Sequence, residues 1–195
     1  MRGYRPLHPA VAGPLVIYFI KIQAWFIGKL ADDDIFLINY NLKMKTILLE
    51  NLEAEIRKEL DEAEEAAKKA YPRDRDVRIG VVLVADGDKK FEGANVVRER
   101  FVGSSCAERM ALDKALFAGI KKIERLIIIG ENNDCPFEEV IAPCGNCRQM
   151  LFDTLDDLEQ SDIEIILSNS DKSKIVKTSL LELLPLAYKS NRNNA

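Results

Sequence analysis

Hydrophobic and polar residues change their spacing several times along the chain, and each change predicts a new element. Between residues 49 and 67 apolar side chains recur every three or four positions, which predicts an amphipathic helix that starts at Leu49 and stops before Pro72. Val77–Ala85 is a β-branched apolar run, which indicates a buried strand. Asp86-Gly87-Asp88 is a hairpin-turn signal, so we expect residues 89–95 to return as the next strand.

Past this hairpin, helix and strand patterns alternate. A sheet with helices packed against its faces is the natural way to bury their apolar sides, so we expect an α/β protein. The predicted elements are a loop over 96–104, a helix that begins near Ser105 or Cys106 and closes at Gly119, a strand over 124–130, a polar loop over 131–142, a helix over 144–155, strands over 163–168 and 175–178, and a helical turn over 180–185.

The first 43 residues differ from the rest of the chain. Ala10–Ile20 is apolar but is interrupted by Pro14, and it falls short of the roughly 20 apolar residues that span a bilayer. We expect residues 1–43 to be an extension, or a start upstream of Met44, outside a domain that covers residues 44–195. An added helix or strand and a membrane anchor are the alternatives for this segment.

Composition narrows the classes of function. The 195 residues carry a net charge of −4, so the chain has no basic field for wrapping nucleic acid, and a small-molecule substrate is easier to reconcile with it. No convincing export signal is present, which favours a cytoplasmic protein without a membrane partner. The single histidine, His8, lies in the N-terminal segment, so a mechanism that needs a catalytic histidine is disfavoured.

Two short motifs carry the candidate chemistry, Cys106-Ala107-Glu108 and Pro143-Cys144-Gly145-Asn146-Cys147. Each is predicted to lie at the start of a helix, where partial positive charge lowers thiol pKa values and favours thiolates. Cys144 and Cys147, three positions apart on one helix, can reach one ion together, and Cys106 completes a set of three zinc ligands. The fourth position on the ion is then open to water.

Glu108 stands two residues after a predicted ligand, and we expect it to move protons at that water as general acid and base. Arg109 and Arg148 each adjoin a ligand and are expected to donate to the sulfur atoms, which partly offsets the charge of three thiolates on zinc. Two alternatives are open. Cys135 as a fourth ligand would give a closed structural site, and the C-x-x-C pair alone would be a redox dithiol.

Together these motifs resemble the cytidine deaminase family, whose zinc signature combines a ligand, a glutamate two residues later and P-C-x-x-C. The all-cysteine version is similar to the small homotetrameric nucleoside deaminases, and the resemblance extends from about Leu49 to Tyr188. It implies a three-layer α/β/α fold with a mixed sheet, zinc as cofactor, and a tetramer or dimer with active sites near subunit interfaces. It also implies hydrolytic deamination of cytidine, deoxycytidine or an analogue to the uracil form and ammonia.

The substrate-binding residues follow the family less closely. The resemblance assigns Asn95 to the sugar of the substrate. Val77, however, stands where family members usually have a phenylalanine, and Val97 where they usually have an acidic residue that binds ribose. These departures leave open a deaminase of blasticidin S or of another amino-substituted heterocycle. A non-catalytic, zinc-stabilised module is the third hypothesis.

Overall fold

The computed structural model describes residues 45–73, 77–132 and 137–189, all of which belong to one compact unit. The extension expected over residues 1–43 and the boundary at Met44 lie outside the described residues. None of the helices in the described ranges combines the length and the apolar character that crossing a membrane requires.

The elements, in chain order, are β1 (Lys45–Ile47), the 3-10 turn η2 (Leu49–Asn51), α2 (Ala54–Lys68), β2 (Val77–Ala85), β3 (Lys89–Ala94), the 3-10 turn η4 (Phe101–Gly103), α3 (Ala107–Phe117), β4 (Ile123–Asn132), α4 (Gly145–Asp157), β5 (Glu164–Ser168), β6 (Ile175–Ser179) and α5 (Leu180–Leu183).

The six strands form one mixed sheet in the order β1-β6-β5-β4-β2-β3. β2 pairs antiparallel with both β3 and β4, β6 pairs antiparallel with β5 and β1, and β4 and β5 form a parallel pair. Because β3 and β4 are each antiparallel to β2, they run in the same direction. α3 follows β3 and α4 follows β4, so both helices begin at the same end of the sheet, where ligand sites of α/β proteins commonly lie.

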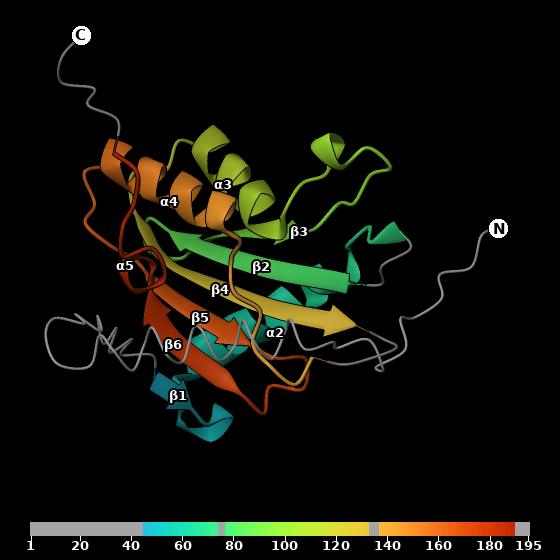
Figure 1. Ribbon diagram of the computed structural model, residues 1–195. Coiled ribbons are helices and arrows are strands. Elements are labelled where there is room, and N and C mark those ends of the chain that lie inside the picture. Colours follow the sequence, from blue (N-terminus) through green and yellow to red (C-terminus); the bar gives the residue numbers. More distant parts are fainter. Residues whose placement is uncertain (1–44, 74–76, 133–136, 190–195) are drawn as a thin grey trace, which may run out of the picture. The chain divides into compact units, whose positions relative to one another are not determined.

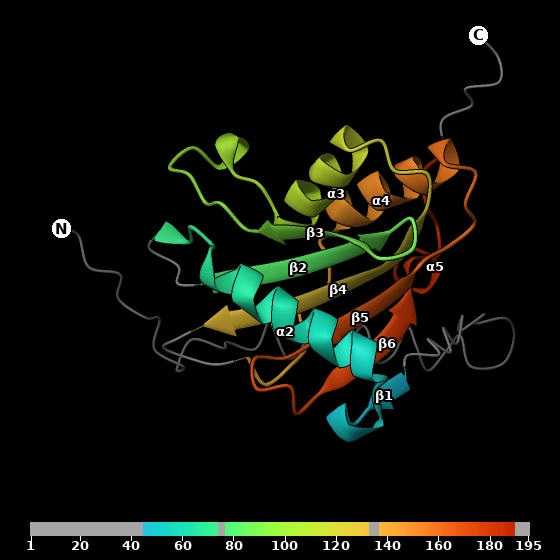
Figure 2. The same ribbon diagram turned by 180° about the vertical axis from the view of Figure 1, so that it is seen from behind.

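The sheet lies between two helical layers, with α3 and α4 on one face (Figure 1) and α2 across the other (Figure 2). Alternate residues of β2 serve the two cores. Val81 and Leu83 belong to the core beneath α3 and α4, whereas Val82 and Val84 belong to the core beneath α2. Strand side chains point to opposite faces in turn, which is why a continuous apolar run marks a strand covered on both sides. The predicted three-layer α/β/α fold with a mixed sheet is confirmed.

Most of the predicted elements are present, with small shifts at their ends. The predicted strand over Val77–Ala85 is β2 itself, and the short strand over 175–178 is β6 with one further residue. Gly119 ends α3 as expected, with a φ of 72° that glycine adopts without strain.

Two features at the start of the described chain differ from expectation. The prediction of one helix from Leu49 is wrong, because extended backbone at Leu52 and Glu53 separates the short turn η2 from α2. β1 is an element that the hydrophobic pattern did not indicate. It has three residues and, among the described strands, pairs with β6 alone, and so short a strand carries no periodic signal.

The connection between β2 and β3 is a tight turn with a charged residue at its start. Asp86 and Gly87 have φ values of 48° and 90°, as a type I′ hairpin requires. Asp86 Oδ1 accepts hydrogen bonds of 2.9 Å from the backbone N–H groups of Lys121 and Lys122. These bonds attach the turn to the loop that leads into β4.

A buried ion pair joins α2 to the sheet. The Glu59 side chain is fully buried, and its two oxygens accept hydrogen bonds of 2.7 and 2.9 Å from Nε and Nη2 of Arg125 in β4. Lys90 Nζ lies 3.8 Å from the same carboxylate, and Glu55 lies 3.4 Å from Arg125 Nη2. The two-pronged geometry sets the position of α2 across the strands as well as its orientation.

Candidate metal centre and active site

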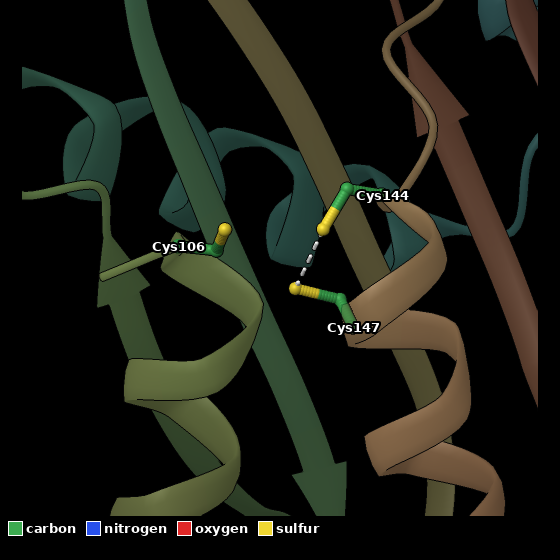
Figure 3. A group of neighbouring side chains, drawn as sticks. All are labelled: Cys106, Cys144 and Cys147. Atoms are coloured by element: carbon green, nitrogen blue, oxygen red, sulfur yellow. Dashed lines mark hydrogen bonds between the residues drawn. The ribbon is translucent and has the colours of Figure 1, made fainter. Parts of the chain in front are cut away.

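Three cysteine side chains meet at the common end of α3 and α4 (Figure 3). Cys106 is the N-cap residue of α3, Cys144 is the N-cap residue of α4, and Cys147 lies in the first turn of α4. Their Sγ atoms all lie within 4.8 Å of one another, and those of Cys144 and Cys147 are 3.5 Å apart. The structure therefore brings together the three side chains that the sequence predicted as zinc ligands.

The backbone at the two helix starts leaves these sulfur atoms available. Cys106 and Cys144 have extended φ and ψ and make no side-chain hydrogen bond to their own helices, unlike the hydroxyl or carboxylate residues that usually occupy an N-cap. All three cysteines are free of disulfide bonds. Cys135, the alternative fourth ligand, lies outside the described residues, so the hypothesis of a closed site stays untested.

Three sulfur atoms with one open side suit a zinc ion. Zn–S bonds of about 2.3 Å place the sulfur atoms of a tetrahedral site roughly 3.8 Å apart. A cluster whose atoms lie within 4.8 Å of one another reaches that spacing with a small adjustment of side chains. The donor set therefore fits zinc, which prefers sulfur and nitrogen ligands and tetrahedral coordination.

The charge state of the cluster is also suitable for metal binding. The pKa of Cys106 is lowered to about 6, first because the Cys147 thiol donates a hydrogen bond to it, and further by the thiol of Cys144 and the charge of Arg109. The pKa of Cys147 is raised by the same hydrogen bond and by burial. A thiolate at Cys106 is thus favoured near neutral pH, and zinc binds thiolates.

Glu108 lies in the first turn of α3, two residues after Cys106. Its side chain belongs to a residue that is only 6% exposed, and it lines the same cavity as Cys106 and Cys144. Burial raises the pKa of Glu108, while its own backbone N–H and Cys147 act in the opposite direction. A carboxyl group with a raised pKa inside a cavity is suited to accept and release a proton.

The two arginines beside the ligands differ in their surroundings. Arg109 acts on Cys106 through its charge, and its buried Nε has no hydrogen-bond partner within the described part of the chain. Arg148 instead donates hydrogen bonds of 2.7 Å to the carbonyl oxygens of Pro143 and Leu183. The guanidinium of Arg148 therefore fastens the segment before Cys144 to the end of α5, a role that the sequence analysis did not foresee.

A cavity of about 540 Å³ opens beside the cysteine cluster, a volume typical of small-molecule sites. Cys106, Cys144 and Glu108 line this cavity, and Cys147 is not among its lining residues. Val77 and Val97 were singled out from the sequence, whereas their apolar neighbours in the wall were not, because isolated apolar residues carry no chemical signal. The apolar lining residues are Val77, Ile79, Val96, Val97, Val102, Ala107, Ile141 and Ala142.

Asn95 lines this cavity, yet much of its side chain is already engaged. Its Oδ1 accepts a 2.7 Å hydrogen bond from the Ile79 N–H, and its Nδ2 donates a 2.8 Å hydrogen bond to the Val77 carbonyl. An amide side chain has one further N–H and one further lone pair, so a contact with substrate is still possible. Asn95 thus holds the end of β3 against β2, and its assignment to the sugar stays a prediction.

Comparison with known proteins agrees with this geometry. The family model for the cytidine and deoxycytidylate deaminase zinc-binding region matches residues 54–157. The probable cytidine deaminase of Dictyostelium discoideum is 31% identical over 131 residues, which cover 67% of this chain and 82% of that protein. The blasticidin-S deaminase of Bacillus cereus is 30% identical over 98 residues, which cover 48% of this chain and 65% of that protein.

The fold has solved relatives as well. The crystal structure of cytidine deaminase from Burkholderia pseudomallei is similar with a TM-score of 0.58 and 32% sequence identity, over 70% of this chain and all of that one. The stretch matched by the family model contains the three clustered cysteines and Glu108. The chain therefore belongs to the cytidine and deoxycytidylate deaminase family of zinc-dependent hydrolases.

Proposed function

We propose that this protein hydrolyses the amino group at C4 of a cytosine nucleoside, cytidine or deoxycytidine, to give the uracil form and ammonia. The observation that carries the proposal is the placement of Glu108. A buried carboxyl group lines one cavity together with two of three clustered cysteines, whose sulfur atoms lie within 4.8 Å of one another. That arrangement supplies a metal site, a proton carrier and space for a small ring in one place.

Cys106, Cys144 and Cys147 would hold zinc, which when bound lowers the pKa of a water molecule so that hydroxide is available near neutral pH. Glu108 accepts the proton of the attacking water and passes it to N3 of the ring. A carbon–oxygen bond forms at C4, and the carbon–nitrogen bond to the amino group then breaks. Glu108 transfers the second proton to the departing amine, so water and substrate balance the uracil product and ammonia.

Other residues of the cavity would bind and orient the substrate. The apolar wall formed by Val77, Ile79 and Ile141 suits the faces of a pyrimidine ring. Asn95, whose side chain has one N–H and one lone pair beyond its bonds to Ile79 and Val77, would bind a hydroxyl of the sugar. Arg109, beside Cys106, would offset part of the negative charge of three thiolates and so preserve the electrophilic character of the metal.

An ultraviolet assay of cytidine turnover tests the role of Glu108. We expect Glu108→Ala and Glu108→Gln to lower kcat by about 10²- to 10⁴-fold while zinc content is unchanged, because both remove the proton carrier and neither removes a ligand. Asp113→Asn, which removes a carboxylate from the exposed side of the same helix, is the matched control and should retain parental kcat. Equal ammonia release by the parent and Glu108→Ala would remove Glu108 from the mechanism.

A second candidate is deamination of a different amino-substituted heterocycle, such as blasticidin S. Its support is that Val77 and Val97 both line the cavity, and that Glu108 is the only carboxylate among the described lining residues, which leaves none beside these valines for a ribose hydroxyl. Such a difference changes selectivity by orders of magnitude when a site is built to bind a hydroxyl group. A panel of cytidine, deoxycytidine and blasticidin S decides between the candidates. A kcat/KM for cytidine at or above that of the other compounds would remove the second one.

We also propose that the protein is a homo-oligomer, a tetramer or a dimer, and that residues 44–195 form the deaminase domain. Val102 supports the first part, because it lines the cavity and is 97% exposed, so the mouth has an apolar residue that a second copy could cover. β1 supports the second part, since Lys45–Ile47 already belongs to the sheet through its pairing with β6. A chain that starts at Met44 should therefore match the full chain in kcat/KM.

A further inference from the structure

Gly93 in β3 lies directly beneath the first turn of α3. A Cβ atom at this position would lie 2.0 Å from the carbonyl oxygen of Ala107 and 2.8 Å from the backbone nitrogen of Ala111. Real Cβ atoms essentially never lie closer than 3.0 Å to a heavy atom of a neighbouring element. Because both contacted atoms belong to the helix backbone, no change of side-chain rotamer can relieve the overlap, and the helix itself would have to move.

α3, the helix that makes this close approach, positions Cys106 and Glu108 of the candidate active site. Ala107 stands between Cys106, the N-cap residue, and Glu108, the buried carboxyl group. To lengthen the distance between the added Cβ and the Ala107 carbonyl oxygen from 2.0 to 3.0 Å, the start of α3 would have to move by about 1 Å. The opposing sulfur atoms belong to α4 and would not follow. A shift of that size is a large part of a zinc–sulfur bond length of about 2.3 Å.

We propose that Gly93 is a positioning residue for the metal centre, whose missing side chain sets the distance of Cys106 and Glu108 from the cysteines of α4. The proposal rests on the proposed function only in taking zinc as the bound ion. Metal ligands tolerate little displacement, and changes to residues that orient them typically weaken metal binding 10- to 100-fold. Gly93 therefore acts on the reaction through the backbone of α3, without touching the substrate.

The structure offers a matched control in Gly80 of β2. A Cβ atom at Gly80 would lie 1.9 Å from the carbonyl oxygen of Ala63 and 2.5 Å from the backbone nitrogen of Ala67, both in α2. The two glycines belong to neighbouring residue pairs of the β2–β3 hairpin, because Gly93 pairs with Val81 and Gly80 pairs with Ala94. A Cβ at Gly93 would point towards α3, and one at Gly80 towards α2 on the other face of the sheet. α2 contains none of the candidate site residues, so Gly80→Ala causes the same kind of clash away from the metal centre.

The test compares Gly93→Ala and Gly80→Ala in the full chain. Zinc affinity is measured by competition with a chelator, and stability by denaturant unfolding with the chelator in excess. We expect both variants to be destabilised, but only Gly93→Ala to bind zinc at least about tenfold more weakly, as for other changes behind metal ligands. Cobalt added in place of zinc should show altered sulfur-to-cobalt absorption in Gly93→Ala alone. Equal zinc affinity in the two variants would overturn the proposal.

A milder pair keeps the test decisive if Gly93→Ala does not fold. Ala111→Ser adds one oxygen to a fully buried residue whose backbone nitrogen approaches Gly93, and Ala67→Ser adds one to a fully buried residue whose backbone nitrogen and Cβ approach Gly80. The first should weaken zinc binding and the second should not, and equal affinities again overturn the proposal.

Zinc affinity is measured without substrate. A parent protein that binds zinc but deaminates nothing would thus refute the proposed function and leave the role of Gly93 standing.

Discussion

Asp86 combines two properties that the β2–β3 turn requires. Its φ of 48° lies in the left-handed region, which aspartate and asparagine enter more readily than most residues. Its carboxylate accepts the backbone N–H groups of Lys121 and Lys122, so one side chain both forms the turn and attaches it to the start of β4. Hydrogen bonds to the ionised form, that from Lys121 first, lower the pKa of Asp86.

Stability should therefore depend on the ionisation of Asp86. A lowered pKa in the folded state means that the stabilisation is present above the unfolded pKa of about 4 and is lost as pH falls through the folded value. Asp86→Asn tolerates the positive φ but has no charge. We expect the parent to have the higher Tm at pH 7 and the difference to shrink as pH falls below about 4. Thermal unfolding between neutral and acidic pH measures this.

Asp88→Asn is the control, because it removes a charge from the same turn and leaves the two bonds to Asp86 in place. A Tm difference between the parent and Asp86→Asn that is the same at every pH would contradict the assignment.

The packing of the helices on the sheet depends on two glycines and one buried ion pair, none of which belongs to the active site. α3 approaches the sheet over Gly93, and α2 approaches the other face over Gly80 and is joined to β4 by the pair of Glu59 and Arg125. Burying both charges is costly unless each is fully hydrogen-bonded. The pair therefore determines where α2 lies more than it adds to stability.

Replacing one partner of this ion pair should lower the free energy of unfolding more than replacing both partners. Arg125→Met leaves the buried Glu59 carboxylate with only Lys90 nearby, so we expect the free energy of unfolding to fall by about 3 kcal/mol. Glu59→Leu with Arg125→Met should recover most of that loss. Lys68→Met, which breaks an exposed pair with Glu65, is the control and should leave the unfolding midpoint close to that of the parent. A double variant no more stable than Arg125→Met would contradict this account. Denaturant unfolding provides the comparison.

At the scale of the whole molecule, the cavity is open on one side. Val102, on the turn η4, is among its lining residues and is 97% exposed, and Phe117 at the end of α3 is also 97% exposed. An exposed apolar residue at the edge of a binding site is typical of a surface that meets a partner. The position of Val102 agrees with the proposal that active sites lie near the interfaces of a homo-oligomer, whereas Phe117 lies at the other end of α3 from the cavity.

Activity should then depend on protein concentration. If a second copy completes the mouth of the cavity, dilution through the dissociation range will lower the specific activity towards cytidine, and concentrating the sample will restore it. Val102→Asp should move that fall to higher protein concentration, because it places a charge at the interface. Sedimentation velocity measures the oligomeric state over the same range. Constant specific activity while the oligomer dissociates would count against a shared site.

Local patterns in the sequence are enough to predict the order of the main elements and the residues of a candidate zinc site. Val77–Ala85 carries a strand signal strong enough to give the bounds of β2, and Asp86-Gly87 fixes the turn after it. The spacing of Cys106, Glu108 and the C-x-x-C pair was sufficient to predict a zinc site with a proton carrier. These are local signals, since they depend on neighbours within a few positions.

Which of these residues come into contact depends on how the helices and strands pack. Cys106 and Cys144 are 38 positions apart in the sequence, and their sulfur atoms converge because β3 and β4 run the same way, so α3 and α4 start side by side. The burial of Glu108, the apolar wall around Val97 and the contact beneath Gly93 likewise depend on how layers pack. Such distances arise from contacts between residues remote in sequence, and no local pattern encodes them.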